Sequence, residues 1–202
     1  MRCSSIVYLV TLALLALSGA SCGGGGGDGS MVNPGLTVRF TDSGIPSAQD
    51  LVRLVGTPSG GRVAIQVALA GPTTSDDIAA FAFDVAIGDP SVLAFGDVNA
   101  EVGPALATPG CLDPIVLAEQ RGDRVVVGIT KLGCAGNGLP AGEQTIVTLS
   151  FRVLEAGTST LTLAGSPATP TSPAGEPAAL DSDTVKIDSI RFDGLAATVQ
   201  AM

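Results

Sequence analysis

The chain has 202 residues, of which ten are basic and nineteen acidic, and it contains no histidine and no tryptophan. Its formal net charge of −9 at pH 7 disfavours nucleic acid as a partner, because binding phosphates requires a basic surface. Without histidine there is no Ser-His or Cys-His pair and no imidazole metal ligand, and no spacing of acidic residues marks a carboxylate pair of the glycosidase kind. These absences predict a protein that is not an enzyme, with no cofactor and no metal site.

Residues 1–21 are typical of an export signal. Arg2 precedes an apolar run from Ile6 to Leu17, and small residues separate this run from Cys22. At about 1.5 Å per residue the run spans about 18 Å, less than the roughly 30 Å hydrocarbon core, so it does not predict a membrane span. The segment resembles a bacterial lipoprotein signal, although Gly19 replaces the usual Leu, and this resemblance implies acylation of Cys22.

Ordinary cleavage after Ala20, without a lipid, is the alternative for this N-terminus. In the lipoprotein interpretation, residues 22–34 form a Gly-rich tether with a reach of about 20 Å, and residues 35–202 form the domain. Gly23 rather than Asp follows the cysteine, which in the resembling lipoproteins permits transport to the outer membrane. We therefore expect an exported protein of the cell envelope, held at the outer membrane by its lipid.

The cysteines also favour export. Cys3 leaves with the signal and Cys22 takes the lipid, so Cys111 and Cys134 remain. Two cysteines in an oxidising compartment predict a disulfide, which would close a loop of about 23 residues and contribute about 3 kcal/mol. Two free thiols are the alternative.

From Leu36 onward, apolar residues recur at every second position, which predicts strands with one buried face. The alternating positions are Leu36, Val38 and Phe40; Val63, Ile65, Val67 and Leu69; Phe81, Phe83, Val85 and Ile87; and Val147, Leu149, Phe151 and Val153. Gly122 and Asp123, between the apolar runs Ile115–Leu117 and Val125–Val127, predict a hairpin. No segment has helical periodicity, so the predicted fold is all-β, with two antiparallel sheets packed face to face.

Two loops near the C-terminus allow functional interpretations. The segment from Ser166 to Pro177 holds four prolines and predicts an extended loop, with glycosylation or ligand contact as the functional alternative. Asp181, Asp183 and Asp188 could form a structural calcium site. Their spacing matches no dedicated calcium loop, so a solvated acidic turn is the favoured interpretation.

The run from Ile78 to Leu93 resembles the central segment of cohesin domains, in which an alternating strand ends in an Asp-Pro-x-Val-Leu turn. Segments similar to later cohesin strands follow in the same order, at Gly142–Val153, at Gly157–Leu163 and from Asp193 onward. The resemblance covers about residues 50–200. It implies a nine-stranded jelly-roll sandwich related to several carbohydrate-binding modules.

Cohesins bind the helical dockerin module through the outward face of the strand that corresponds to Ile78–Ile87. In this chain the outward positions are Ala80, Ala82, Asp84 and Ala86. The resemblance therefore implies a partner-binding face that is flatter and more apolar than is usual in the family, with Asp84 as its polar anchor. Packing of this row against another strand, a loop or the N-terminal segment is the alternative. Gly88 adds one residue before the Asp-Pro turn, which predicts a bulge.

The expected function is a non-enzymatic, lipid-anchored module that binds an extracellular protein, for example a dockerin-like chain. Polysaccharide binding is the alternative, but residues 22–202 contain no Trp or Tyr to stack on sugar rings, and the phenylalanines occupy positions typical of a core. These phenylalanines are Phe40, Phe81, Phe83, Phe95, Phe151 and Phe192. A purely structural role in the envelope is the third interpretation.

Overall fold

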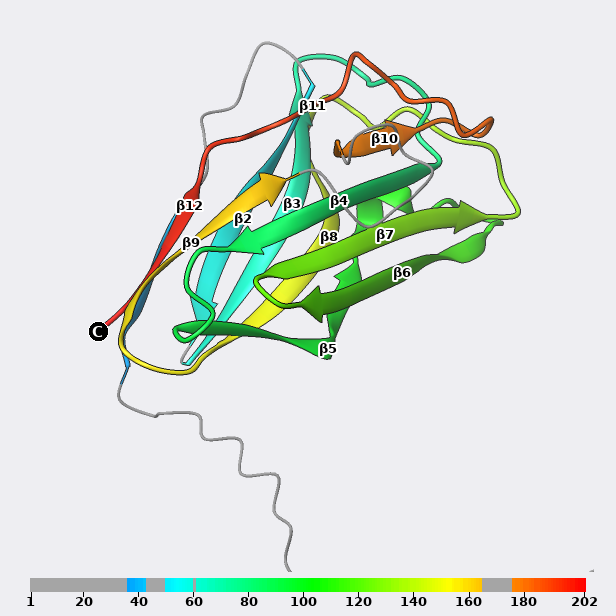
Figure 1. Cartoon of the computed structure of the whole chain (residues 1–202). Helices are drawn as coiled ribbons and strands as arrows, with labels where there is room; N and C mark the ends of the chain where they lie inside the picture. The colour runs from blue at the N-terminus through cyan, green and yellow to red at the C-terminus, as the bar shows by residue number, and fades with distance from the viewer. Residues whose placement is uncertain (1–35, 43–49, 60, 165–175) are drawn as a thin grey trace, which may run out of the picture. The chain divides into compact units, whose positions relative to one another are not determined.

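The computed structural model describes residues 36–42, 50–59, 61–164 and 176–202 (Figure 1). The predicted export signal, the acylation site Cys22 and the tether lie outside the described residues, and so does most of the proline-rich segment from Ser166 to Pro177. Within the described ranges, no helix is long and apolar enough to cross a membrane.

The described residues form twelve strands and one short 3-10 helix, η1 (Pro104–Leu106). The strands are β1 (Val38–Thr41), β2 (Leu51–Ser59), β3 (Arg62–Gly71), β4 (Ala80–Ile87), β5 (Leu93–Val102), β6 (Leu112–Arg121), β7 (Arg124–Leu132), β8 (Gly142–Val153), β9 (Gly157–Ala164), β10 (Ala178–Leu180), β11 (Arg191–Phe192) and β12 (Ala197–Ala201). The resemblance implied nine strands. The larger number arises because β1, β10 and β11, each of four residues or fewer, are separate short strands.

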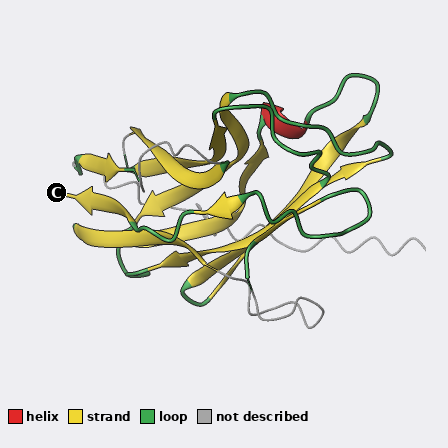
Figure 2. Ribbon diagram, turned by 90° about the horizontal axis from the view of Figure 1, so that it is seen from above, coloured by secondary structure: helices red, strands yellow, loops and turns green. Residues whose placement is uncertain are grey.

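The strands build two facing sheets, as predicted (Figure 2). One sheet has seven strands in the order β1-β12-β9-β4-β7-β6, with β10 also paired to β4. The other has five strands in the order β11-β2-β3-β8-β5. The described pairs are antiparallel except for the two-residue pair of β11 with β2. In this topology β4 lies inside its sheet, whereas β6 is an edge strand.

The core forms because alternate residues of each strand face the other sheet. In β3 the odd-numbered residues from Val63 to Leu69 are buried, and they lie opposite buried residues of β8 that include Phe151. The rings of Phe95 and Phe151 pack with centroids 5.5 Å apart. Four of the six phenylalanines are buried, and Phe40 and Phe192 are half-buried against the core. Burying each large apolar side chain contributes about 1.5–3 kcal/mol, which holds the two sheets together.

The predicted disulfide is present. Cys111 and Cys134, which are 23 positions apart in sequence, are joined, and their Cα atoms lie 5.9 Å apart. Cys111 precedes β6 and Cys134 follows β7, so the bond ties together the open end of the β6–β7 hairpin. The turn at the other end contains Gly122, whose φ of 64° favours glycine.

The bulge predicted at Gly88 is wrong. β4 pairs with β7 and with β9 in an unbroken register and ends at Ile87. Gly88 follows the strand, and its N–H donates to the carbonyl oxygen of Thr160 at 2.8 Å. A Cβ on Gly88 would lie 2.2 Å from Thr160 Oγ1, so the close approach of the two chain segments explains the glycine.

Candidate partner-binding face

The row of residues predicted to bind a partner lies on the outward face of β4. Ala80, Ala82 and Ala86 are half-buried there, on the side opposite to the core residues Phe81 and Phe83. Both edges of β4 are occupied by strands, β7 on one side and β9 with β10 on the other. The three alanines therefore belong to a continuous sheet surface and remain partly accessible.

Asp84 is not exposed, as the sequence predicted, but buried. Its side chain is 0% exposed, although it belongs to the outward row. Asp84 Oδ2 lies 3.8 Å from Nη1 of Arg124, a partly exposed residue at the start of β7. A fully buried carboxylate cannot act as the surface anchor that the sequence suggested. Asp84 is instead the buried ion-pair partner of the accessible guanidinium of Arg124.

The outward face continues from β4 over β7 to β6 in cross-strand rows. Ala82 lies opposite Gly128 of β7, and Gly128 lies opposite Leu117 of β6. The next row pairs Val126 of β7 with Glu119 of β6. Because register partners on neighbouring strands point to the same side of a sheet, these residues share one face.

A hollow of about 380 Å³ opens on this face. Its lining includes Ala82, Leu117, Val126 and Gly128. Gly128 gives the hollow its depth, because a Cβ added at this position would meet no atom within 4 Å. The hollow therefore suits an apolar group on a partner.

The most exposed apolar side chains of the face are on β6, a strand that the sequence analysis did not assign to the site. Leu117 is 73% exposed, and Leu112 and Ile115 are exposed as well. In the sequence, the apolar run Ile115–Leu117 predicts a strand. It does not show which side of that strand faces the core. Because β6 is an edge strand, its outward side chains have a neighbouring strand on one side only.

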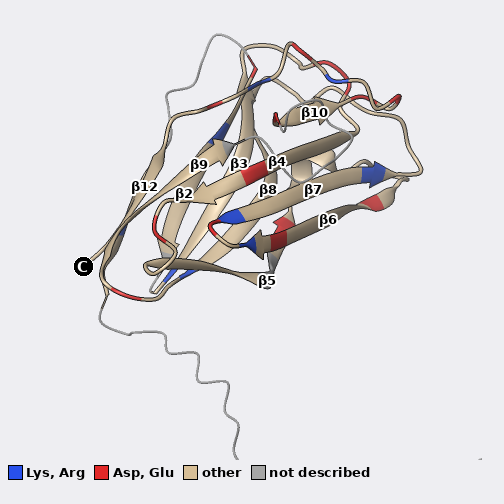
Figure 3. Cartoon of the chain, viewed as in Figure 1, with Lys and Arg blue, Asp and Glu red and all other residues tan. Residues whose placement is uncertain are grey.

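Charged side chains lie toward the ends of β6 and β7, and the middle of the face carries few of them (Figure 3). Arg121 Nη2 donates to Glu119 Oε2 at 2.8 Å, and this hydrogen bond raises the pKa of Arg121. Arg124 lies opposite Arg121 in the register of the two strands. The face therefore has an apolar centre, with two arginines and one glutamate at one end.

The acidic loop after β10 is held by its own hydrogen bonds. Asp181 Oδ1 accepts from the backbone N–H groups of Asp183 and Val185, each at 2.9 Å. Asp183 and Asp188 are exposed. In the part of the chain that the structure describes, no three cysteine, aspartate or glutamate side chains are grouped so that they could hold a metal ion. The carboxylate of Asp181 shapes the turn.

No protein-family model matches this chain, and no curated protein matches it. Solved structures do match. The second type II cohesin module of the adaptor scaffoldin ScaA from Acetivibrio cellulolyticus aligns with a TM-score of 0.54 and 14% identity, over 73% of this chain and 87% of that one. A type II cohesin domain from the cellulosome of the same organism aligns with a TM-score of 0.51 and 13% identity, over 75% and 95% of the two chains. This chain has a cohesin-like fold.

A third similar structure was determined as a complex. It is a type II cohesin–X–dockerin complex from Acetivibrio cellulolyticus, which aligns with a TM-score of 0.52 and 13% identity over 74% of this chain and 98% of that one. At such low identity the similarity concerns the fold. It assigns no role to individual residues of β4, β7 and β6.

Proposed function

We propose that this chain is a non-enzymatic module of the cell envelope, anchored by a lipid on Cys22, that binds an extracellular protein. The partner docks on the outward face of β4, β7 and β6. The observation that carries the proposal is the apolar hollow beside Leu117, on a sheet of a cohesin-like fold. The similar structure described as a cohesin–X–dockerin complex supports a protein as the partner.

The grouping of exposed apolar side chains supports a docking role. Leu117 and Ile115 project from the edge strand β6, and the hollow at Gly128 lies beside Leu117. Withdrawing a leucine side chain from water contributes about 1.5–3 kcal/mol. Large contiguous apolar surfaces on soluble domains mark interaction sites. A preformed sheet also binds without the cost of ordering a loop.

The charges beside the hollow favour a particular kind of partner. Arg124 and Arg121 lie at one end of the apolar centre, and both guanidinium groups are accessible. Arginine binds carboxylates through paired, directional hydrogen bonds. A partner that presents an apolar side chain to the hollow and a carboxylate to the arginines would match this face.

Polysaccharide is the weaker candidate. Sugar-binding faces stack exposed aromatic rings on sugar rings. Residues 22–202 contain no Trp or Tyr, and the phenylalanines are buried in or packed against the core. A sugar ligand would therefore depend on polar contacts alone.

The test is capture of proteins from the culture medium of the source organism by the immobilised domain and by two variants. Leu117→Arg places a charge at the centre of the face, and Leu195→Arg is the matched control. Leu195 is 62% exposed, but it lies in the loop before β12. We expect Leu117→Arg to lose the captured protein and Leu195→Arg to retain it, with both variants melting close to the wild type. Equal capture by both variants, or recovery of polysaccharide alone, contradicts the proposed function.

The lipid anchor has a separate test, because binding and anchoring can fail independently. Mass spectrometry of the native N-terminus should find a chain that begins at an acylated Cys22. Cys22→Ser should then move the protein from the membrane fraction to the soluble fraction. An unmodified mature chain that begins at Ser21 or Gly23 would contradict the proposed lipid anchor. It would have no bearing on the proposed binding face.

A further inference from the structure

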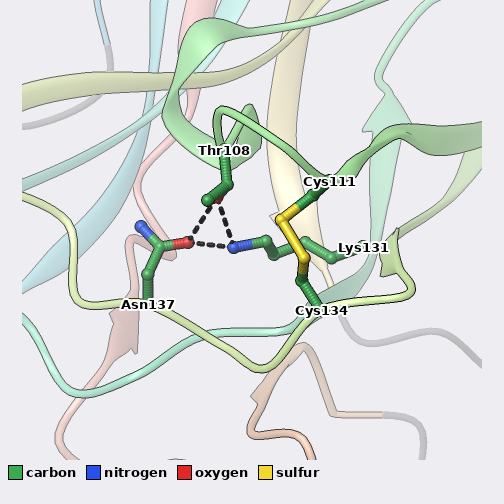
Figure 4. Close-up of a disulfide and its surroundings, with 5 residues drawn as sticks. All are labelled: Thr108, Cys111, Lys131, Cys134 and Asn137. Atoms are coloured by element: carbon green, nitrogen blue, oxygen red, sulfur yellow. Dashed lines mark hydrogen bonds between the residues drawn. A yellow bond between two sulfur atoms is a disulfide. The ribbon is translucent and has the colours of Figure 1, made fainter.

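A buried lysine belongs to the surroundings of the disulfide at the open end of the β6–β7 hairpin (Figure 4). Lys131, near the end of β7, continues the inward row of Val125, Val127 and Ile129 and is only 7% exposed. The other lysine of the chain, Lys186, is exposed and pairs with Glu176 at 2.9 Å. One lysine is therefore buried and the other is exposed to solvent.

The amine of Lys131 has neutral hydrogen-bond partners. Nζ donates to Thr108 Oγ1 at 2.8 Å and contacts Oδ1 of Asn137 (Figure 4). None of the ion pairs among the described residues includes Lys131. Burial lowers the pKa of Lys131, and the nearby charge of Asp77 acts in the opposite direction. An ammonium group whose hydrogen-bond partners are both neutral is costly in such a buried place, so burial shifts this amine toward its uncharged form.

The backbone of Asn137 is held in place by two hydrogen bonds to Ile78. Its backbone N–H donates to the carbonyl of Ile78 at 3.2 Å, and its own carbonyl accepts from the N–H of Ile78 at 3.0 Å. The segment that leads from Lys131 to Asn137 is fixed in its middle by the disulfide at Cys134. The amine and the side-chain amide are therefore kept in contact before any reaction, which is the condition under which bond formation between them becomes fast.

We propose that Lys131 and Asn137 become joined by an amide bond between Lys131 Nζ and Asn137 Cγ. The lone pair of the neutral amine attacks Cγ, the bond from Cγ to Nδ2 breaks, and a proton from Nζ leaves with Nδ2 as ammonia. The exchange needs no oxidant, reductant or cofactor. Nζ keeps one hydrogen, which it can still donate to Thr108 Oγ1.

Asp77 belongs to the surroundings of this pair, since its charge acts on Lys131. It directly precedes Ile78, the backbone partner of Asn137, and a Cβ built on Gly138 would lie 3.7 Å from Asp77 Oδ1. The resulting cross-link would close a ring from residue 131 to residue 137 and would survive reduction of the neighbouring disulfide.

The test is peptide mapping of the full-length protein after reduction and alkylation. Trypsin cleaves after Arg124, Lys131 and Arg152, so an unmodified chain yields peptides 125–131 and 132–152. An acylated lysine is not a trypsin site. We therefore expect one peptide, 125–152, with a mass lower by one ammonia than the sum of its residues requires. Complete recovery of peptide 125–131 overturns the proposal.

The variant Lys131→Arg separates this reaction from a competing one. Asn137 precedes Gly138, and an Asn-Gly pair can also lose ammonia by closing a succinimide on its own backbone, which leaves Lys131 open to trypsin. We expect Lys131→Arg and Asn137→Ala to abolish the ammonia loss, and the control variant Lys186→Arg to leave it unchanged. Ammonia loss that persists in Lys131→Arg identifies the succinimide and overturns the proposal. The measurement on the wild-type chain decides the question even if a variant fails to fold.

Discussion

Leu117 of β6 and Gly128 of β7 form one register pair, so the most exposed large apolar side chain among the described residues stands beside a position without a side chain. The surface of the sheet therefore has a protruding apolar side chain directly beside a hollow. This relationship makes the face specific in shape although it carries little charge at its centre.

Gly128→Val should weaken partner binding without harming the fold. The added side chain occupies the hollow, while the open space around a Cβ at this position means that no atom must move. Glycine inside a strand is unfavourable by about 0.5–1 kcal/mol relative to alanine, so the free energy of unfolding should stay level or rise. Urea unfolding and a binding titration on the same sample measure the two effects. Unchanged affinity would place the interface elsewhere.

Ala82→Arg should abolish capture of the partner while the domain remains folded. Ala82 lies between Gly128 of β7 and Ala178 of β10, so a long side chain has room above the face, and a charge at the centre of an apolar interface is costly. Melting temperature and capture must be measured together. An unfolded variant would show that the chain itself covers the face, and a folded variant with full capture would exclude this face as the interface.

Cys111→Ser should lower the free energy of unfolding by about 2–4 kcal/mol, because the unfolded chain gains freedom when the disulfide is lost. Urea unfolding with and without a reducing agent measures this. The wild type in reducing agent should match the variant, and the variant should not respond to the agent. Two alkylatable thiols in the unreduced wild-type protein would contradict the bond itself.

Arg124→Ala should destabilise the domain more than Arg121→Ala. Arg124 lies beside the fully buried carboxylate of Asp84, and removing a partner from a buried charge costs about 1–3 kcal/mol or more. Arg121 pairs with Glu119 where both side chains are exposed to solvent, and such pairs contribute little. Chemical denaturation of the two variants compares them directly. Equal stability of both would show that Asp84 does not depend on Arg124.

Much of the fold could be predicted from local sequence. Alternation of apolar residues is a property of neighbouring positions, and it located β3, β4 and β8. The turn residues Gly122 and Asp123, between two apolar runs, located the β6–β7 hairpin. The disulfide followed from counting the cysteines that remain once the predicted export signal and acylation site are set aside. The inferences about the strands succeeded because side-chain direction in a strand alternates with a period of two wherever the strand lies in the sheet.

The candidate site was predictable only in part, because its decisive features depend on which strands become neighbours. The sequence placed Ala82 on an outward row, but it also placed Asp84 on the surface, where the structure buries it beside Arg124. Nothing local marks β6 as an edge strand or sets Leu117 opposite Gly128. Edges, register partners and buried polar clusters such as that of Lys131 arise from long-range pairing, so tertiary structure alone decided them.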